Sequence, residues 1–480
     1  MDRIGNRIFE LRQEAGLTQK ELAEELGVTQ RTLSKWESGI SEPSAGHMVS
    51  LYRRFGRALF ERETDRNHSG TGRPAMASIK ELYKIGRGPS SSHTIGPESA
   101  CRIINDRHPD ADRVRVVLFG SLAKTGRGHG TDRVIHETLK ASQVEVIFDH
   151  TTPTRHPNTL RFSVFAGENL VGEHEALSIG GGDIVFDGVV LHKSREVYGE
   201  KNFSQIRRYC EENHLSLWEY AKQKEADLWE YLAKVWEQMK ASVRNGLEDD
   251  GILPGGLGVH KKAKQLFRSG KPDEAPETKE NRLICAYAFA VSEQNAYAQT
   301  IVTAPTCGAA GVLPAVLYYE QRKNHFPDEK IYRALATAGI IGNVIKTNAS
   351  ISGAECGCQA EIGSACAMAA AAAGELYDLG VEKIEYAAEI ALEHHLGLTC
   401  DPVCGLVQIP CIERNAVAAM RAINAVNLAD LLWQTRKISF DNIVETMKET
   451  GTDLRSPYRE TAEGGLAKNY RPERKPEQIP

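Results

Sequence analysis

The sequence lacks the long apolar run that a membrane helix needs. Its longest apolar run, Ala365 to Ala373, is rich in alanine and well short of the roughly 18 residues that a span requires. Arg3 and Arg7 open the chain, but no apolar core of a secretion signal follows them. We therefore expect a cytoplasmic protein with no membrane partner.

No charge of one sign dominates the chain. Its 480 residues hold 59 Lys and Arg against 64 Asp and Glu, a net charge of −5. This balance excludes a basic coat for nucleic acid, although a single basic face stays possible. The length suggests two to four domains, and 41% hydrophobic residues are enough for ordinary globular cores.

Cysteine is scarce, and its placement says more than its number. Ten cysteines are too few for a disulfide scaffold, yet eight of them fall between Cys285 and Cys411. In a reducing compartment such a group indicates a metal or catalysis, and packing in small core spaces is the alternative. No C-x-x-C pair occurs, which disfavours a zinc ribbon. Spacing alone leaves five candidate ligands: Cys356, Cys358, Cys400, Cys404 and Cys411.

Residues 1–66 predict a small helical domain. Thr18-Gln19-Lys20-Glu21 has the form of a capping box, Gly27 allows a left-handed turn, and Thr29 can cap a second helix. This helix, turn and helix resemble the Cro/repressor-like DNA-binding domain of bacterial regulators. The resemblance implies DNA as a partner, and a helical protein–protein module is the alternative. The residues that it places in the major groove are Thr29, Gln30, Arg31 and Lys35.

The rest of the chain predicts a multidomain α+β fold. We expect a linker over 67–76, a small α/β domain over 77–225, a helical connector over 226–280, a large all-α domain over 281–470 and a loose tail over 471–480. Strands are expected at 114–119, 144–148, 161–165 and 184–190, where apolar runs are bounded by Gly, Asn or Asp.

Two polar loops in the α/β part hold groups that suit acid–base work. Gly88 to Pro97 contains S-S-S-H-T, and Gly120 to Asp132 contains G-H-G-T-D. Their hydroxyls can bind a carboxylate or an ammonium group, and the imidazoles of His93 and His129 can move protons near neutral pH. Lys346 would serve as a base if burial lowered its pKa. Loop histidines with structural partners and a surface lysine are the alternatives.

From Ile79 to Tyr470 the chain resembles the iron–sulfur-dependent bacterial L-serine dehydratases of the single-chain type. The motifs that carry the resemblance are S-S-H-T and G-H-G-T-D in the α/β part, followed by G-C-Q, T-C-D-P and P-C-I-E-R-N in the helical part. The resemblance implies a beta-chain-like α/β domain and an alpha-chain-like helical domain. It also implies a 4Fe–4S cluster held by three of the candidate cysteines, Cys358, Cys400 and Cys411.

The implied reaction deaminates L-serine to pyruvate and ammonia by eliminating the β-hydroxyl. Three thiolates for four irons would leave one iron open as a Lewis acid for that hydroxyl. A homodimer is expected, since repressor-like domains and this family tend to pair. The catalytic candidates are His93, His129 and Lys346. The candidates for substrate binding are Ser91, Ser92, Thr94, Thr131, Asp132, Thr306, Gly308, Asn348 and Ser350.

Three cysteines depart from the family pattern. Cys307 stands where the family more commonly has Asn, and Cys356 and Cys404 add thiols beside two presumed ligands. A related lyase for L-cysteine or L-threonine therefore stays open. So does a transcription regulator whose enzyme-like body senses serine. Pyridoxal phosphate chemistry is disfavoured, since no lysine lies in a pyridoxal-type context.

Overall fold

The computed structural model describes residues 76–190 and 197–470, together with residues 8, 9, 11–13, 15, 17–37, 41, 43, 44, 47, 50, 51, 54 and 55. The chain divides into two units, Met1–Pro74 and Ala75–Pro480, and the fold is a mixture of α and β as predicted. The predicted tail and all of the predicted linker except Met76 lie outside the described residues.

The first unit contains the two helices that the sequence predicts. They are α2 (Gln19–Glu25) and α3 (Gln30–Glu37). The predicted capping box is present, because Glu21 N donates to Thr18 Oγ1 at 3.2 Å and Thr18 N donates to Glu21 Oε2 at 2.7 Å. Gly27, with a φ of +68°, makes the left-handed turn between the helices. Leu22 and Trp36 help to fill the core of this unit.

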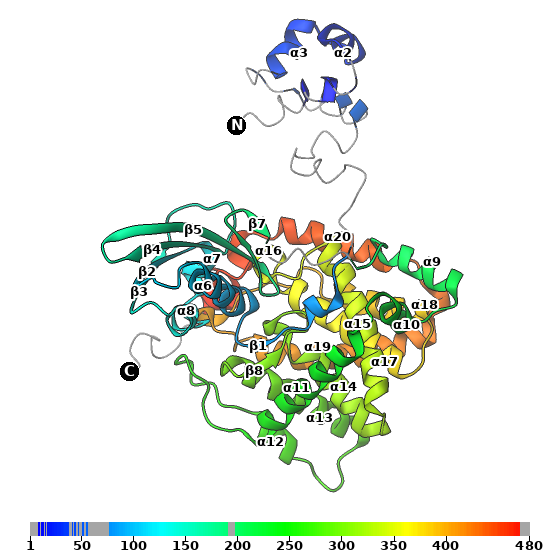
Figure 1. The fold of residues 1–480 in the computed structure, drawn as a ribbon. Coiled ribbons are helices and arrows are strands. Elements are labelled where there is room, and N and C mark those ends of the chain that lie inside the picture. Colours follow the sequence, from blue (N-terminus) through cyan, green and yellow to red (C-terminus); the bar gives the residue numbers. More distant parts are fainter. Residues whose placement is uncertain are drawn as a thin grey trace. The chain divides into compact units, whose positions relative to one another are not determined.

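The second unit contains a six-stranded sheet in the order β3-β2-β4-β5-β6-β7, in which only β2 and β3 are parallel (Figure 1). Helices α6 and α8 cover one face, so inward residues of the strands alternate with exposed ones. The bounds are β2 (Arg113–Phe119), β3 (Gln143–Asp149), β4 (Thr159–Ala166), β5 (Asn169–Gly180), β6 (Asp183–Phe186), β7 (Val189–Val190), α6 (Gly96–Arg107), α7 (Gly120–Thr125) and α8 (Thr131–Thr138).

The four predicted strand segments are confirmed. One of them is divided into two strands, and one further strand of the sheet was not predicted. A two-residue turn at Asp187 and Gly188 divides the segment 184–190 into β6 and β7. Strand β5 was not predicted, because Gly172 and the charged residues around it interrupt the apolar pattern.

The remainder is a helical body beside the sheet (Figure 1). Its central helix α17 is buried along its whole length, and its alanines let α15 and α18 approach closely. The bounds are α9 (Phe203–Asn213), α10 (Leu217–Lys224), α11 (Leu228–Glu248), α12 (Ala263–Arg268), α13 (Pro276–Ala296), α14 (Val312–Asn324), α15 (Asp328–Asn348), α16 (Gly353–Cys356), α17 (Ser364–Leu376), α18 (Val381–Glu393), α19 (Cys411–Leu432), α20 (Phe440–Asp453) and α21 (Gly465–Asn469).

The helical core is larger than the sequence division at residue 225 suggests. Helices α9 and α10 contribute Phe203 and Tyr220 to this core, not to the core under the sheet. Ile79 joins it as well, and the short strands β1 (Ile85–Arg87) and β8 (Thr300–Val302) pair antiparallel. The two parts are therefore tied together where the first polar loop begins. None of the described helices is long and apolar enough to cross a membrane.

Candidate active site

A small cavity lies where loops of the α/β part meet loops of the helical body. Its walls come from segments far apart in the sequence, and three of its lining residues are cysteines. The lining residues are Pro89, Ser90, His129, Gly308, Cys358, Glu361, Cys400, Pro402, Val407, Cys411 and Glu460.

Cys358, Cys400 and Cys411 reach the cavity from three separate places. Cys358 follows α16, Cys400 lies in the loop after α18, and Cys411 begins α19. The hydrogen bond from the Cys400 thiol lowers the pKa of Cys358 to about 6, and the nearby Arg414 guanidinium acts in the same direction. Arg414 is held in place by the Thr399 carbonyl, to which its Nη1 donates at 2.9 Å.

The other two candidate ligands lie elsewhere. Cys404 is exposed, in a left-handed conformation with a φ of +55°. Cys356 is buried against α20, where a Cβ added to Gly451 would lie 2.5 Å from its sulfur. Of the five cysteines that spacing allowed, three therefore line the cavity.

The two predicted histidines are buried side by side. Their ring centroids are 4.3 Å apart. His129 Nδ1 donates to the Thr125 carbonyl at 2.9 Å, so Nε2 carries the lone pair, and it has no hydrogen-bond partner among the described residues. His93 Nε2 lies 3.1 Å from Ser121 Oγ and 2.9 Å from Thr125 Oγ1. The pair thus has one free acceptor, on the cavity side.

Burial keeps both imidazoles neutral. It lowers the pKa of His129 to about 4, against a weaker opposing effect of the bond to Thr125. Burial and the neighbouring His129 hold the pKa of His93 well below its ordinary value. Neutral imidazoles can accept protons at physiological pH, as a general base must.

Two carboxyl groups complete the cavity, and sequence reasoning missed both. Glu460 Oε1 lies 3.5 Å from His93 Nδ1 and 3.8 Å from His129 Nε2. Burial raises the pKa of Glu361 to about 8, and the charge of Cys358 adds to this rise. Burial also raises the pKa of Glu460 well above its ordinary value, and Glu361 acts in the same direction. Both groups can therefore carry a proton inside the cavity.

Several predicted substrate residues hold the histidine loops together. Thr94 Oγ1 donates to the His129 carbonyl at 3.2 Å, and Thr131 Oγ1 donates to the His93 carbonyl at 2.6 Å. Ser91 and Ser92 are buried in the turn that carries His93. The two threonine hydroxyls fix the two loops relative to each other.

Only one of the other predicted substrate residues lines the cavity itself. Gly308 lines it, and Thr306 contacts Glu361. The remaining four, Asp132, Lys346, Asn348 and Ser350, are not among its lining residues.

Hydrogen bonds to neighbouring residues hold those four side chains. Lys346 Nζ donates to Asp183 Oδ2 at 2.8 Å, and Asn348 Nδ2 donates to the Val344 carbonyl at 2.9 Å. Ser350 Oγ donates to Glu355 Oε2 at 2.5 Å, and Asp132 Oδ1 accepts from Arg133 N at 2.9 Å. Their functional roles stay predictions.

The predicted DNA-contacting residues lie at the surface of the first unit. Thr29, Gln30, Arg31 and Lys35 are all exposed, at the start of α3 and along it. Their exposure leaves a polar helix face that a groove could accept.

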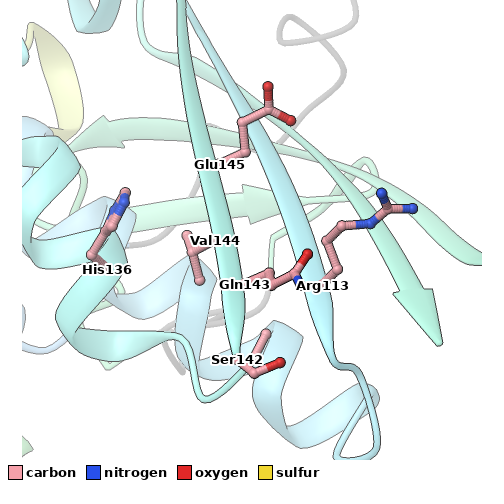
Figure 2. A pocket seen from close by; sticks show the side chains of 7 residues that line it. Arg113, His136, Ser142, Gln143, Val144 and Glu145 are labelled. Carbon is pink, nitrogen blue, oxygen red and sulfur yellow. The ribbon is translucent and has the colours of Figure 1, made fainter. Parts of the chain in front are cut away.

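A surface hollow at the edge strand β3 is separate from this chemistry. Figure 2 shows Arg113, His136, Gln143 and Glu145 among the side chains around it. It contains no cysteine and none of the predicted catalytic residues.

Three family models match this chain. The serine dehydratase alpha chain family matches residues 137–467, the serine dehydratase beta chain family matches 78–152, and a helix-turn-helix family matches 8–61. An L-serine dehydratase of Streptomyces coelicolor is 39% identical over 448 aligned residues, covering 82% of this chain and 98% of the relative. L-serine dehydratase 2 of Escherichia coli is 38% identical, with the same coverage of both chains.

Proposed function

Because the chain belongs to the family of iron–sulfur-type serine dehydratases, we propose that it is an L-serine ammonia-lyase that forms pyruvate and ammonia in the cavity of its second unit. One observation carries the proposal. Cys358, Cys400 and Cys411, from three separate segments, line one cavity together with His129. Thiols and a neutral imidazole are the groups that cluster binding and proton abstraction need.

The cavity residues fit a 4Fe–4S cluster. Cys358, Cys400 and Cys411 would hold it, and the Arg414 guanidinium would offset part of the negative charge of thiolates and sulfides. A cluster with one iron free of protein ligands supplies a Lewis acid for the departing hydroxyl of serine.

The chain's own residues move the protons. In our proposal His129 Nε2 takes the α-proton of serine, since this atom is an unpaired acceptor on the cavity wall. The Cβ–O bond breaks and water leaves, with its proton supplied from the Glu460 carboxyl. The enamine that remains tautomerises to an imine, which water hydrolyses to pyruvate and ammonia. His93, packed against His129, holds and exchanges protons with Glu460.

The test compares single cysteine variants of anaerobically purified protein. Cys358→Ser, Cys400→Ser and Cys411→Ser should each lose most iron and sulfide and most pyruvate formation from L-serine. Cys404→Ser is the matched control, since Cys404 is exposed and lies in the same loop as Cys400. We expect it to keep both. Full iron content and turnover in any of the three ligand variants would contradict the proposal.

Substrate choice within the lyase class is tested by side-by-side assay. We propose L-serine, because the related proteins are named L-serine dehydratases. Cys307 is buried beside the cavity residue Gly308. Because the family more commonly has Asn at the position of Cys307, L-cysteine and L-threonine are the substrates to compare. A higher kcat/KM for either would replace serine in the assignment.

We further propose that the first unit binds DNA and makes the enzyme an autoregulator. Support comes from the helix-turn-helix match and from the exposed Gln30 and Arg31. The unit would bind two half-sites as a homodimer. The full chain should shift its own promoter fragment at low salt, and Arg31→Ala should weaken this shift while leaving pyruvate formation unchanged. No shift at low salt would remove the proposal, and a DNA response to serine without turnover would favour a regulator that only senses serine.

A further inference from the structure

We propose that His108 and His174 form a binding site for a divalent transition-metal ion in the α/β part, outside the active-site cavity. Their Nε2 atoms face each other at 2.7 Å. Neither histidine lines the cavity described above. The proposal rests on this pair and its surroundings, and it does not depend on the proposed lyase activity.

The fold brings the two rings together between the C-terminal end of α6 and strand β5. His174 belongs to the side of β5 that faces α6, and it pairs in register with Phe162 of the core. His108 directly follows α6, where its backbone N–H still donates to the Ile104 carbonyl at 2.9 Å. Helix and strand therefore each present one imidazole.

Gly172 leaves the space that the two rings occupy. It lies two residues before His174, on the same side of β5. A Cβ at this position would lie 2.8 Å from His108 Cε1 and 2.9 Å from His174 Nε2. A side chain at this position would force one or both rings to shift.

A carboxylate sets the tautomer of His174. Asp187 stands in the two-residue turn between β6 and β7, and its Oδ2 accepts from His174 Nδ1 at 2.7 Å. With the proton on Nδ1, Nε2 of His174 presents a lone pair. This is the arrangement in which a metal-bound histidine donates its second nitrogen to a carboxylate. Arg107 fixes the same Oδ2, to which its Nη1 donates at 2.9 Å.

The second imidazole is also available as a ligand. Burial and the neighbouring His174 and Arg107 lower the pKa of His108, so the ring is neutral at physiological pH. A bridging proton or a metal ion can fill the space between the nitrogens. A tetrahedral ion needs them roughly 3.3 Å apart, so the rings must separate by about 0.6 Å. Paired imidazoles suit zinc, nickel or copper, and water would complete the coordination of the ion.

The experiment titrates Ni²⁺ into the anaerobically purified full chain, without an affinity tag, in a calorimeter. We expect wild type to bind one equivalent more than His108→Ala or His174→Ala. His136→Ala, a change of an exposed histidine on α8, is the matched control and should bind as wild type. Asp187→Asn should weaken binding about 10- to 100-fold, since it removes only the supporting carboxylate.

Gly172→Ala separates ligand loss from misfolding, because it keeps both histidines but crowds them. It should lose the same equivalent of Ni²⁺. Ni²⁺ should also raise the melting temperature of wild type and of the His136 variant, but not that of His174→Ala. Equal Ni²⁺ uptake by wild type, His108→Ala and His174→Ala would overturn the proposal.

Discussion

Glu460 Oε1 lies 3.5 Å from His93 Nδ1, so a carboxyl from the C-terminal part of the chain contacts a histidine of the α/β part. Two hydrogen bonds to the backbone of Glu460 fix this contact. Glu460 N donates to the Cys400 carbonyl at 2.9 Å, and Ser121 Oγ donates to the Glu460 carbonyl at 2.7 Å. The same carboxyl lies 3.8 Å from His129 Nε2. One group can therefore exchange protons with both imidazoles.

Replacing Glu460 with Gln should lower kcat for L-serine by about 100-fold or more, because the amide keeps the shape but cannot exchange the proton. KM should change little. Pyruvate formation, normalised to iron content, measures the effect. Glu463→Gln is the control, since Glu463 pairs with Lys124 and does not line the cavity. An unchanged kcat in the Glu460 variant would exclude a role in proton transfer.

Acid should destabilise the second unit through His129. Its pKa is about 4 in the folded chain, against an ordinary value of 6.5. Below pH 6.5 the unfolded chain binds more protons than the folded one, so the free energy of unfolding falls as pH falls. Between pH 7.5 and 5.5 this residue should account for a loss of about 1 kcal/mol.

Urea unfolding followed by tryptophan fluorescence at these two pH values measures the loss. His129→Asn should reduce the pH dependence by about 1 kcal/mol. His136→Asn should leave it as in wild type, because His136 is exposed. The same slope in all three chains would mean that His129 is not buried as a neutral group.

The sequence predicted the cysteines better than the carboxyls, for a physical reason. Cys358, Cys400 and Cys411 are three of the five cysteines in glycine- and proline-bearing motifs, and the family resemblance, not the spacing, implied those three. Glu460 carries no such signal, because it reaches the cavity through backbone pairing with the Cys400 segment. Glu361 follows Cys358 closely, yet only the turn Gln359–Gly363 shows that it points into the cavity.

Strands that depend on tertiary contacts are equally hard to predict from local sequence. Those with apolar alternation, such as β2, were predicted, but β5 was not. The inward positions of β5 include Gly172 and His174, which pack against the end of α6 and need no apolar side chain there. Tertiary contacts, not local pattern, specify that strand.

Two variants of one ion pair distinguish a catalytic role of Lys346 from a structural one. Lys346 Nζ donates to Asp183 Oδ2, and Lys84 pairs with the other oxygen of the same carboxylate. If Lys346 abstracts a proton, Lys346→Met should abolish turnover while Asp183→Asn retains it. We expect the two variants to lose activity to a similar, smaller extent, since both loosen the same contact between β6 and α15. Parallel kcat and melting measurements make the comparison.

Replacing Gly311 with Ala should destabilise the fold and displace residues that line the cavity. A Cβ there would lie 2.4 Å from Ser292 Oγ and 2.7 Å from the Ala288 carbonyl. Gly311 N also donates to Asn415 Oδ1 at 3.0 Å, and Asn415 Nδ2 donates to the carbonyls of Gly308 and Cys411. Displacing Asn415 therefore loosens one cavity wall and one presumed cluster ligand.

We expect Gly311→Ala to lower the free energy of unfolding by about 1–3 kcal/mol and to reduce iron content. Gly199→Ala is the matched control, because Gly199 is exposed, nothing lies within 4 Å of its added Cβ and its φ is not in the left-handed region. That variant should stay within about 0.5 kcal/mol of wild type and keep its iron. Equal stability and iron content in both variants would show that the contact between the Gly311 loop and Asn415 does not support the cluster site.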